Sequence, residues 1–192
     1  NQYVFLLIEK IQSFVMKKPV VLFLLMALIL SCTKRETEAE DSGKVEGYKP
    51  VYMSPDKALT VSVEGVEPME DPGKIYWYYN YMFLTDKGKG VHVIDISVPS
   101  NPVKVSFIRI PGVKDVAVKN NFLFADNLTD MVVFNITDVQ NITHVERVKN
   151  VYPVDNQMYP AHVTGAFECV DTTKGMVVGW NKAMLEDPKC RR

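Results

Sequence analysis

The side chains with the clearest chemical potential in this sequence are its three cysteines, because a thiol can be acylated or oxidised to a disulfide. Cys32 directly follows an apolar run, whereas Cys169 and Cys190 lie 21 residues apart near the carboxyl end. Three cysteines are too few to frame a small domain built on disulfides. Their chemistry therefore has to be inferred from the segments around them.

The segment before Cys32 has the layout of a secretory signal peptide. Two lysines follow Met16, and residues 20–30 form an unbroken apolar run of about 11 residues. This length fits a signal peptide and is short of the roughly 20 residues that a membrane-spanning helix needs. We expect residues 1–31 to be a signal peptide that starts at Met16, with residues 1–15 as a spurious upstream extension.

The residues Ile29, Leu30 and Ser31 before Cys32 resemble the lipobox of bacterial lipoproteins. The resemblance implies that diacylglycerol is attached to the sulfur of Cys32. It also implies cleavage between Ser31 and Cys32, followed by acylation of the new amino group with a fatty acid such as palmitate. Two or more acyl chains hold a protein at a bilayer stably, where one does not. The alternative is a buried cysteine at the end of a transmembrane helix.

Residues 32–71 are expected to comprise the lipidated cysteine and a disordered tether. Residues 33–47 lack aromatic side chains and are rich in charge, which favours disorder, and a short strand is expected near residues 60–63. The acidic run behind Cys32 is similar to surface-export signals of Bacteroidetes lipoproteins, but a solvated spacer explains it equally well. The expected location is the cell envelope, at the outer membrane, facing the periplasm or the exterior.

The remaining chemistry-bearing residues suggest no reaction. In an exported protein Cys169 and Cys190 are candidates for a disulfide, and the alternative is two unpaired thiols. His92, His144 and His162 are expected on a third strand, on an outer strand and in a loop, so no metal site is predicted. Nucleophile-elbow, zinc-protease and phosphate-loop motifs do not occur, so no catalytic residue and no cofactor are predicted.

The elements that position these residues come as an internal repeat. Residues 80–85 align with residues 121–126 at an offset of 41, and residues 93–97 align with residues 133–137 at an offset of 40. Self-similarity at about 40 residues is typical of blade-type or solenoid architectures. Each unit reads as four short strands. In the second unit they are expected at residues 113–118, 122–126, 131–136 and 144–148.

The patterning within each unit indicates blades packed between neighbours. In the third strand, Val91 and Val93 face one side and Ile94 and Ile96 face the other, so this strand is expected to be covered on both faces. The fourth strands carry charged side chains, which suit an exposed outer edge. Aspartates recur near the strand ends, and turn capping explains them more simply than a gathered carboxylate site. They are Asp86, Asp95, Asp126 and Asp130.

The segment Val93-Ile94-Asp95-Ile96, with the turn at Asn101-Pro102, resembles the LVIVD repeat, a β-propeller type common in secreted and lipid-anchored bacterial proteins. The resemblance covers residues 72–151, although the second copy departs from it at Phe134 and Asn135. It implies an all-β fold, here a partial β-propeller of about two and a half four-stranded blades after an amino-terminal signal helix. It implies no settled activity.

The repeats are expected at residues 72–112 and 113–151, with an incomplete third at residues 152–192. Residues 167–171 and 174–178 repeat the second hairpin of the unit, but no outer strand follows. Because closed propellers have about four to eight blades, we expect the chain to be the first part of a longer reading frame. The alternatives are several chains assembled into one ring, or an open stack that aggregates.

The sequence thus predicts a lipoprotein anchored in a bilayer, whose repeats bind or scaffold an unknown protein or glycan without enzyme activity. The net charge of −1 gives no electrostatic case for nucleic acid. The alternatives are an amino-terminal fragment of an envelope propeller enzyme, of hydrolase or dehydrogenase type, and a non-functional remnant. The aromatic cluster at residues 76–79 is expected to be propeller core rather than a ligand platform.

Overall fold

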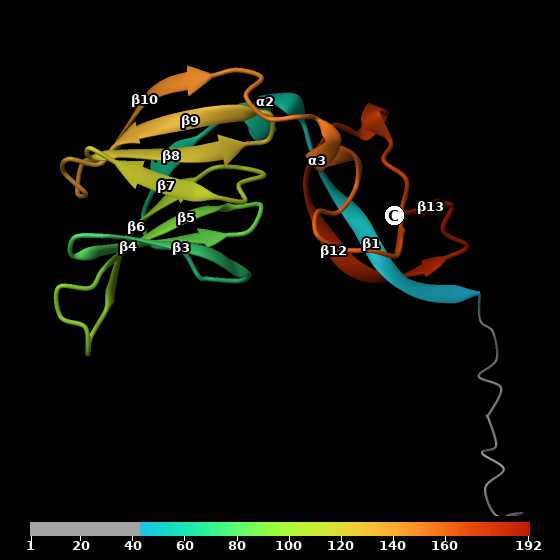
Figure 1. Ribbon diagram of the computed structural model, residues 1–192, viewed down its shortest axis with the longest axis horizontal. Coiled ribbons are helices and arrows are strands. Elements are labelled where there is room, and N and C mark those ends of the chain that lie inside the picture. Colours follow the sequence, from blue (N-terminus) through green and yellow to red (C-terminus); the bar gives the residue numbers. More distant parts are fainter. Residues whose placement is uncertain (1–42) are drawn as a thin grey trace, which may run out of the picture. The chain divides into compact units, whose positions relative to one another are not determined.

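Strands make up nearly all of the regular structure in the computed structural model, which describes residues 43–192. They form three separate sheets, none of which closes on itself (Figure 1). The expected all-β class is therefore confirmed. The predicted signal helix, the cleavage site at Ser31 and the lipidation site at Cys32 lie outside the described residues.

Repeat sheet 1 contains the first repeat, which runs through the antiparallel strands β3 to β6. They are β3 (Pro72–Tyr78), β4 (Tyr81–Asp86), β5 (Gly90–Asp95) and β6 (Val103–Arg109). A fifth strand, β2 (Ser62–Glu64), pairs with β6 from outside, close to the strand expected near residues 60–63. The prediction that the fourth strand of this repeat is an exposed edge was wrong, since β2 covers it.

Repeat sheet 2 contains the second repeat in the same antiparallel order. Its strands are β7 (Val116–Lys119), β8 (Phe122–Asn127), β9 (Asp130–Asn135) and β10 (Thr143–Val148). The four strands predicted for this unit are confirmed, with ends shifted by up to three residues. As expected, β10 is an edge strand (Figure 1). Its side chains are mostly exposed.

The two repeat sheets share one hydrophobic core. Phe83 and Val93 on one side pack with Leu123 and Phe134 on the other, and all four are fully buried. The third strands β5 and β9 are buried along most of their length, which confirms that they are covered on both faces. Consecutive repeats therefore stack through apolar faces, as propeller blades do.

The third sheet differs from the expectation in two ways. Its order is β12-β1-β11-β13, with bounds β1 (Lys44–Met53), β11 (Ala166–Phe167), β12 (Met176–Glu186) and β13 (Cys190–Arg191). The tether predicted for residues 32–71 thus does not extend past residue 43, because residues 44–53 form a strand. The hairpin predicted for residues 167–178 does not form either, because β1 lies between β11 and β12.

Local composition explains why β1 was missed. Charged and small residues at its start suggest disorder, but Val45, Tyr48 and Val51 are half-buried in a strand that pairs with β12 along its whole length. Gly47 permits close packing, since a Cβ there would collide with the carbonyl of Ala166. A distant partner therefore outweighs a weak local preference.

Two short helices and one helical turn complete the described residues. They are α2 (Pro55–Leu59), α3 (Asp155–Met158) and the 3-10 turn η2 (Thr172–Lys174). Ala58 of α2 is fully buried and packs with Leu128 and Val178, which lie in the β8–β9 turn and in β12. Within residues 43–192, no helix is long and apolar enough to cross a membrane.

Candidate functional site

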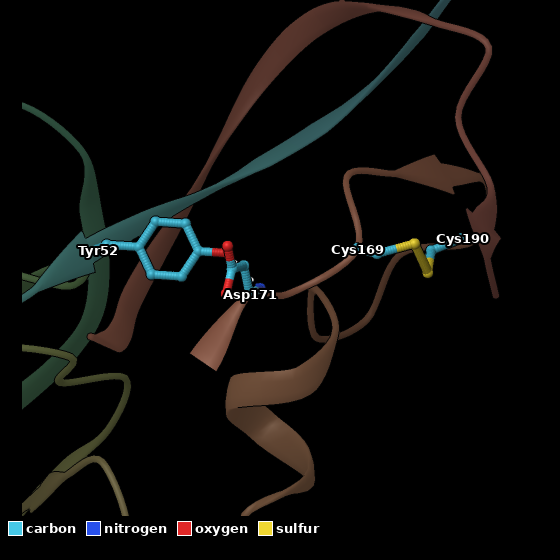
Figure 2. The surroundings of a disulfide bond; sticks show 4 residues. All are labelled: Tyr52, Cys169, Asp171 and Cys190. Carbon is cyan, nitrogen blue, oxygen red and sulfur yellow. Dashed lines mark hydrogen bonds between the residues drawn. A yellow bond between two sulfur atoms is a disulfide. The ribbon is translucent and has the colours of Figure 1, made fainter. Parts of the chain in front are cut away.

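Cys169 and Cys190 form a disulfide in the structure (Figure 2). Phe167 of β11 pairs with Cys190 of β13. This pairing places the Cα atoms of Cys169 and Cys190 5.3 Å apart and their sulfur atoms 2.02 Å apart. The bridge closes a segment whose ends are 21 residues apart, which stabilises the fold by about 3 kcal/mol in a chain-entropy account. Its role is therefore to hold β13 at the edge of the third sheet.

Close to the disulfide, Tyr52 ties β1 to the segment that follows β11 (Figure 2). The backbone N–H of Asp171 donates a hydrogen bond of 2.8 Å to the hydroxyl of Tyr52. The Asp171 carboxylate accepts hydrogen bonds from both the backbone N–H and the hydroxyl of Thr173, at 3.0 and 2.6 Å. This carboxylate caps η2, which fits the expected structural role for aspartates near strand ends.

The candidate functional site is a cavity of about 700 Å³ beside repeat sheet 1. Residues from α2, β2, β6 and β12 line it, together with the segment that joins β2 to β3. Phe107, Pro111 and Val178 give it an apolar part. Concave sites with an apolar floor and a few polar groups are where small ligands and partner segments usually bind.

Ion pairs surround this cavity. The Arg109 guanidinium donates two hydrogen bonds to the Glu64 carboxylate, at 2.7 and 2.6 Å, and lies 3.7 Å from Glu67. Lys89 forms an ion pair with Glu70. The hydrogen bond from Arg109 holds the pKa of Glu64 below its usual range. The cavity rim thus presents both charges, a combination suited to a polar or zwitterionic partner.

A buried carboxylate, Asp86, lies in the wall of the cavity. Its two oxygens accept hydrogen bonds of 2.9 Å from the backbone N–H groups of Glu70 and Asp71. Burial raises the pKa of Asp86, but these hydrogen bonds and the contact with His92 outweigh it, so the pKa lies below its usual value. Asp86 is therefore ionised, and it fixes the segment that leads into β3.

His92 lies behind Asp86 and is also fully buried. Its Nε2 is 3.4 Å from an Asp86 oxygen, whereas its Nδ1 has no hydrogen-bond partner among the described residues. Burial lowers the pKa of His92 below its usual value, against the opposing effect of Asp86. The imidazole is therefore neutral at neutral pH, and the pair is a structural contact sealed from solvent.

The cavity wall is also fixed by a polar network that sequence reasoning missed. The amide nitrogen of Asn127 donates to the carbonyls of Ala58 and Pro111, at 3.0 and 2.6 Å. The guanidinium of Arg147 donates to the side-chain oxygens of Asn127 and Asp130, at 2.7 and 2.9 Å, and to the carbonyl of Leu59. This network attaches α2 to repeat sheet 2. An Asn after an apolar strand was its only signal in the sequence.

The structure does not gather the histidines or the recurring aspartates into one site. His92 lies in β5, His144 lies in β10 against Phe134, and His162 lies in a turn. Within residues 43–192, no group of three or more His, Cys, Asp or Glu side chains is arranged to hold a metal ion. Asp95 caps a turn by accepting a hydrogen bond of 2.8 Å from the N–H of Ser97.

The aromatic cluster divides into two halves. Tyr76 and Tyr78 point toward repeat sheet 2, where the Tyr76 hydroxyl donates to the carbonyl of Val118 at 2.9 Å. Trp77 and Tyr79 are instead 69% and 83% exposed. The expectation that the cluster is core is therefore correct for half of it.

Comparison with known proteins gives one match. The model of the LVIVD repeat family matches residues 74–107, which span β3 to β6. Neither a comparison with curated proteins nor one with solved structures found a match. The match supports a propeller-like repeat for the first unit, in agreement with the resemblance noted in its sequence.

Proposed function

We propose that the protein is a lipoprotein of the cell envelope whose propeller-like repeats bind or scaffold a protein or glycan partner. The cavity beside repeat sheet 1 carries the binding part of this proposal. It has an apolar floor, and its lining also carries the cations Lys57, Lys89 and Arg109 and several carboxylates. Such a rim selects a partner by complementary charge, while the apolar floor contributes affinity.

The anchoring part of the proposal is supported by the sequence before and at Cys32. An apolar run ends in Ile29, Leu30 and Ser31, and a cysteine follows directly. We propose that lipid on Cys32 holds the repeat sheets at the outer membrane, with residues 33–43 as the tether.

Metabolic labelling with a fatty-acid analogue tests the anchor. In the full chain, Cys32→Ala is expected to abolish lipid incorporation and signal cleavage, since the thiol that would receive the lipid is removed. Thr33→Ala, the adjacent control, should be labelled like the wild type. Mass spectrometry that finds an unmodified, uncleaved amino terminus in the wild type would contradict lipidation.

The cavity is tested in cells with a photo-cross-linking amino acid at position 57, on its rim. We expect adducts with a specific envelope protein or glycan at this position and none at the control position 149, an exposed site after β10. The double variant Lys57→Ala/Lys89→Ala, with the cross-linker moved to position 60, should reduce the adduct because it removes two cations of the rim. Equal adducts at positions 57 and 149 would refute the cavity as the binding site.

The alternative function is an envelope enzyme, and the His92–Asp86 pair is the observation that favours it. Histidine beside a carboxylate is a common arrangement in general acid–base catalysis. Here, however, the side chains are 0% and 1% exposed, and Asp86 is engaged by backbone N–H groups. A group that touches a substrate needs access to it, so the burial of this pair supports binding over catalysis.

A further inference from the structure

Because the two repeat sheets are equivalent, each face of repeat sheet 1 has a corresponding face in repeat sheet 2. We call the side of each repeat sheet that carries Val116 and Val118, or their equivalents Ile75 and Trp77, the front face. The back face is the opposite side, which carries Tyr76 in repeat sheet 1 and Ala117 in repeat sheet 2. The strand registers establish this equivalence, because Trp77 pairs with Met82 just as Val118 pairs with Leu123.

Inside the chain, the back face of repeat sheet 1 packs on the front face of repeat sheet 2. Tyr76 and Phe83 from the back face lie in one core with Val116, Val118 and Leu123 from the front face. Val116 and Val118 are only 6% and 5% exposed as a result. This junction is a working example of how two repeats of this protein associate.

The front face of repeat sheet 1 and the back face of repeat sheet 2 are not covered by the other repeat sheet. Each has exposed side chains near its first strand, which is β3 in repeat sheet 1 and β7 in repeat sheet 2. On the front face of repeat sheet 1, Ile75 is 53% exposed and Trp77 is 69% exposed, at the positions where Val116 and Val118 are buried. On the back face of repeat sheet 2, Ala117 and Phe122 are exposed, at the positions where Tyr76 and Tyr81 are covered. Each open face therefore presents side chains at the same positions that are buried in the internal junction.

The side-chain sizes of the open faces are complementary. In the internal junction, the large Tyr76 on the back face and the smaller Val118 on the front face lie in one core, and the Tyr76 hydroxyl donates to the Val118 carbonyl. At the open faces the order is reversed, since the small Ala117 lies on the back face and the large Trp77 lies on the front face. Large side chains opposite small ones are what allows two apolar layers to interdigitate.

We propose that two copies of this chain associate head to tail, with the front face of repeat sheet 1 in one copy seated on the back face of repeat sheet 2 in the next. Trp77 of one copy then fills the space above Ala117 of the other. The contact is heterologous, because two different surfaces meet, and it continues the stacking already present within the chain. It involves neither Cys32 nor the cavity, so its failure would leave the proposed function untouched.

The contact is limited to the region around the first strands, β3 in one copy and β7 in the next. The rest of the front face, toward β5 and β6, is already covered by other parts of the same chain. Leu84, His92 and Phe107 are buried there. The segment before β3 crosses this region, with the Glu67 carbonyl bound by Lys104 and the backbone of Glu70 bound by Asp86. The contact is therefore narrower than the internal junction and is expected to depend on protein concentration.

The test uses full-length chains with two different affinity tags, co-purified in mild detergent. Wild-type chains should co-purify, whereas Trp77→Arg alone and Ala117→Arg alone should each weaken self-association at least about tenfold, because each places a charge in an apolar contact. A mixture of the two variants should recover association, since the Trp77→Arg chain keeps its back face and the Ala117→Arg chain keeps its front face. The control Val98→Arg, in the β5–β6 turn, should behave like the wild type.

Three results would overturn the proposal. One is a wild-type chain that stays monomeric at high concentration. Another is self-association that survives in both single variants. The third is a failure of the mixture to recover association when each variant alone has lost it, because the proposed front-to-back contact is intact between the two variants. Tryptophan emission gives an independent readout, because docking should shift the fluorescence of the exposed Trp77 to shorter wavelength.

Discussion

Asp86 and Asp126 each hold the segment that leads into the first strand of their repeat sheet, although the offset of 41 residues aligns Asp126 with Thr85 and Asp86 with Asn127. Asp86 uses both of its oxygens to accept hydrogen bonds from Glu70 and Asp71. Asp126 uses only Oδ1, which accepts from Lys114 and Asp115 at 2.9 and 2.7 Å. Burial raises the pKa of Asp126 and outweighs its hydrogen bonds, whereas the pKa of Asp86 is lowered.

This difference predicts unequal effects of the same substitution. Asp86→Asn should lower the free energy of unfolding by about 1–3 kcal/mol, since the amide NH₂ would face a backbone N–H and leave it unpaired. Asp126→Asn should cost less than about 1 kcal/mol, because the amide oxygen can take over both bonds to Oδ1. Urea unfolding of both variants at pH 7 measures this, and equal losses would contradict it.

The burial of His92 predicts that the free energy of unfolding depends on pH. Burial lowers its folded-state pKa below the usual 6.5, so the stability that depends on its neutral form is present above pH 6.5. That stability is lost as the pH falls through 6.5 toward the folded-state pKa. His92→Val, which installs the residue found at the equivalent Val132, should therefore flatten the stability profile between pH 7 and pH 5. Chemical unfolding over that range checks it, and a variant profile parallel to that of the wild type would exclude His92 as the titrating group.

At the scale of elements, α2 depends on contacts with distant parts of the chain. The helix spans only Pro55–Leu59, and its Ser54 N-cap makes no side-chain capping bond. Helices this short are not stable alone. Arg147 and Asn127 hold the carbonyls of Leu59 and Ala58 instead.

Arg147→Ala should therefore lower the free energy of unfolding by about 3 kcal/mol, because it leaves the buried Asp130 carboxylate without its cation. Asn127→Ala should be non-additive with it in a double-mutant cycle, since the two side chains share one network. The matched control is Lys44→Ala, which removes an exposed pair with Glu186 and should cost less than about 1 kcal/mol. Additive losses would show that the two residues act independently.

Two glycines in strands give a second prediction about elements. A Cβ at Gly90, where β5 begins, would collide with the Ile108 carbonyl and the Phe107 ring, whereas a Cβ at Gly179 in β12 would meet nothing. Gly90→Ala should destabilise the protein by about 1–3 kcal/mol, and Gly179→Ala should be nearly neutral. Thermal unfolding of the pair measures the difference, and similar melting temperatures would contradict close packing at Gly90.

The elements also show how far the sequence could be interpreted. Alternation and the offset of about 40 residues predicted β7 to β10 with ends shifted by no more than three residues, because that pairing is local. The same reasoning missed β1, whose partner β12 lies far along the chain, and it missed α2, whose stability comes from side chains of another sheet. The cavity was not predicted, because it is lined by elements that no local pattern connects. The disulfide was one of two open alternatives, since spacing alone does not fix the distance between two thiols.

At the scale of the whole molecule, the Cys169–Cys190 disulfide is the covalent link within the third sheet. Removing it with the double variant Cys169→Ser/Cys190→Ser should lower the free energy of unfolding by about 3 kcal/mol. Adding a reductant should weaken the wild type to the same degree and leave the variant unchanged. Unfolding curves with and without reductant test this, and an insensitive wild type would mean that the thiols are unpaired.

The position of β1 in the third sheet has a consequence for folding during synthesis. Tyr52 of β1 bonds to Asp171, 119 positions later, and the rest of β1 pairs with β12 and β11. Because synthesis runs from the amino terminus, β1 emerges long before its partner strands β11 and β12. Contacts between such distant positions close slowly. During that wait the strand has an unpaired backbone, the condition under which partly folded chains recruit a chaperone or aggregate.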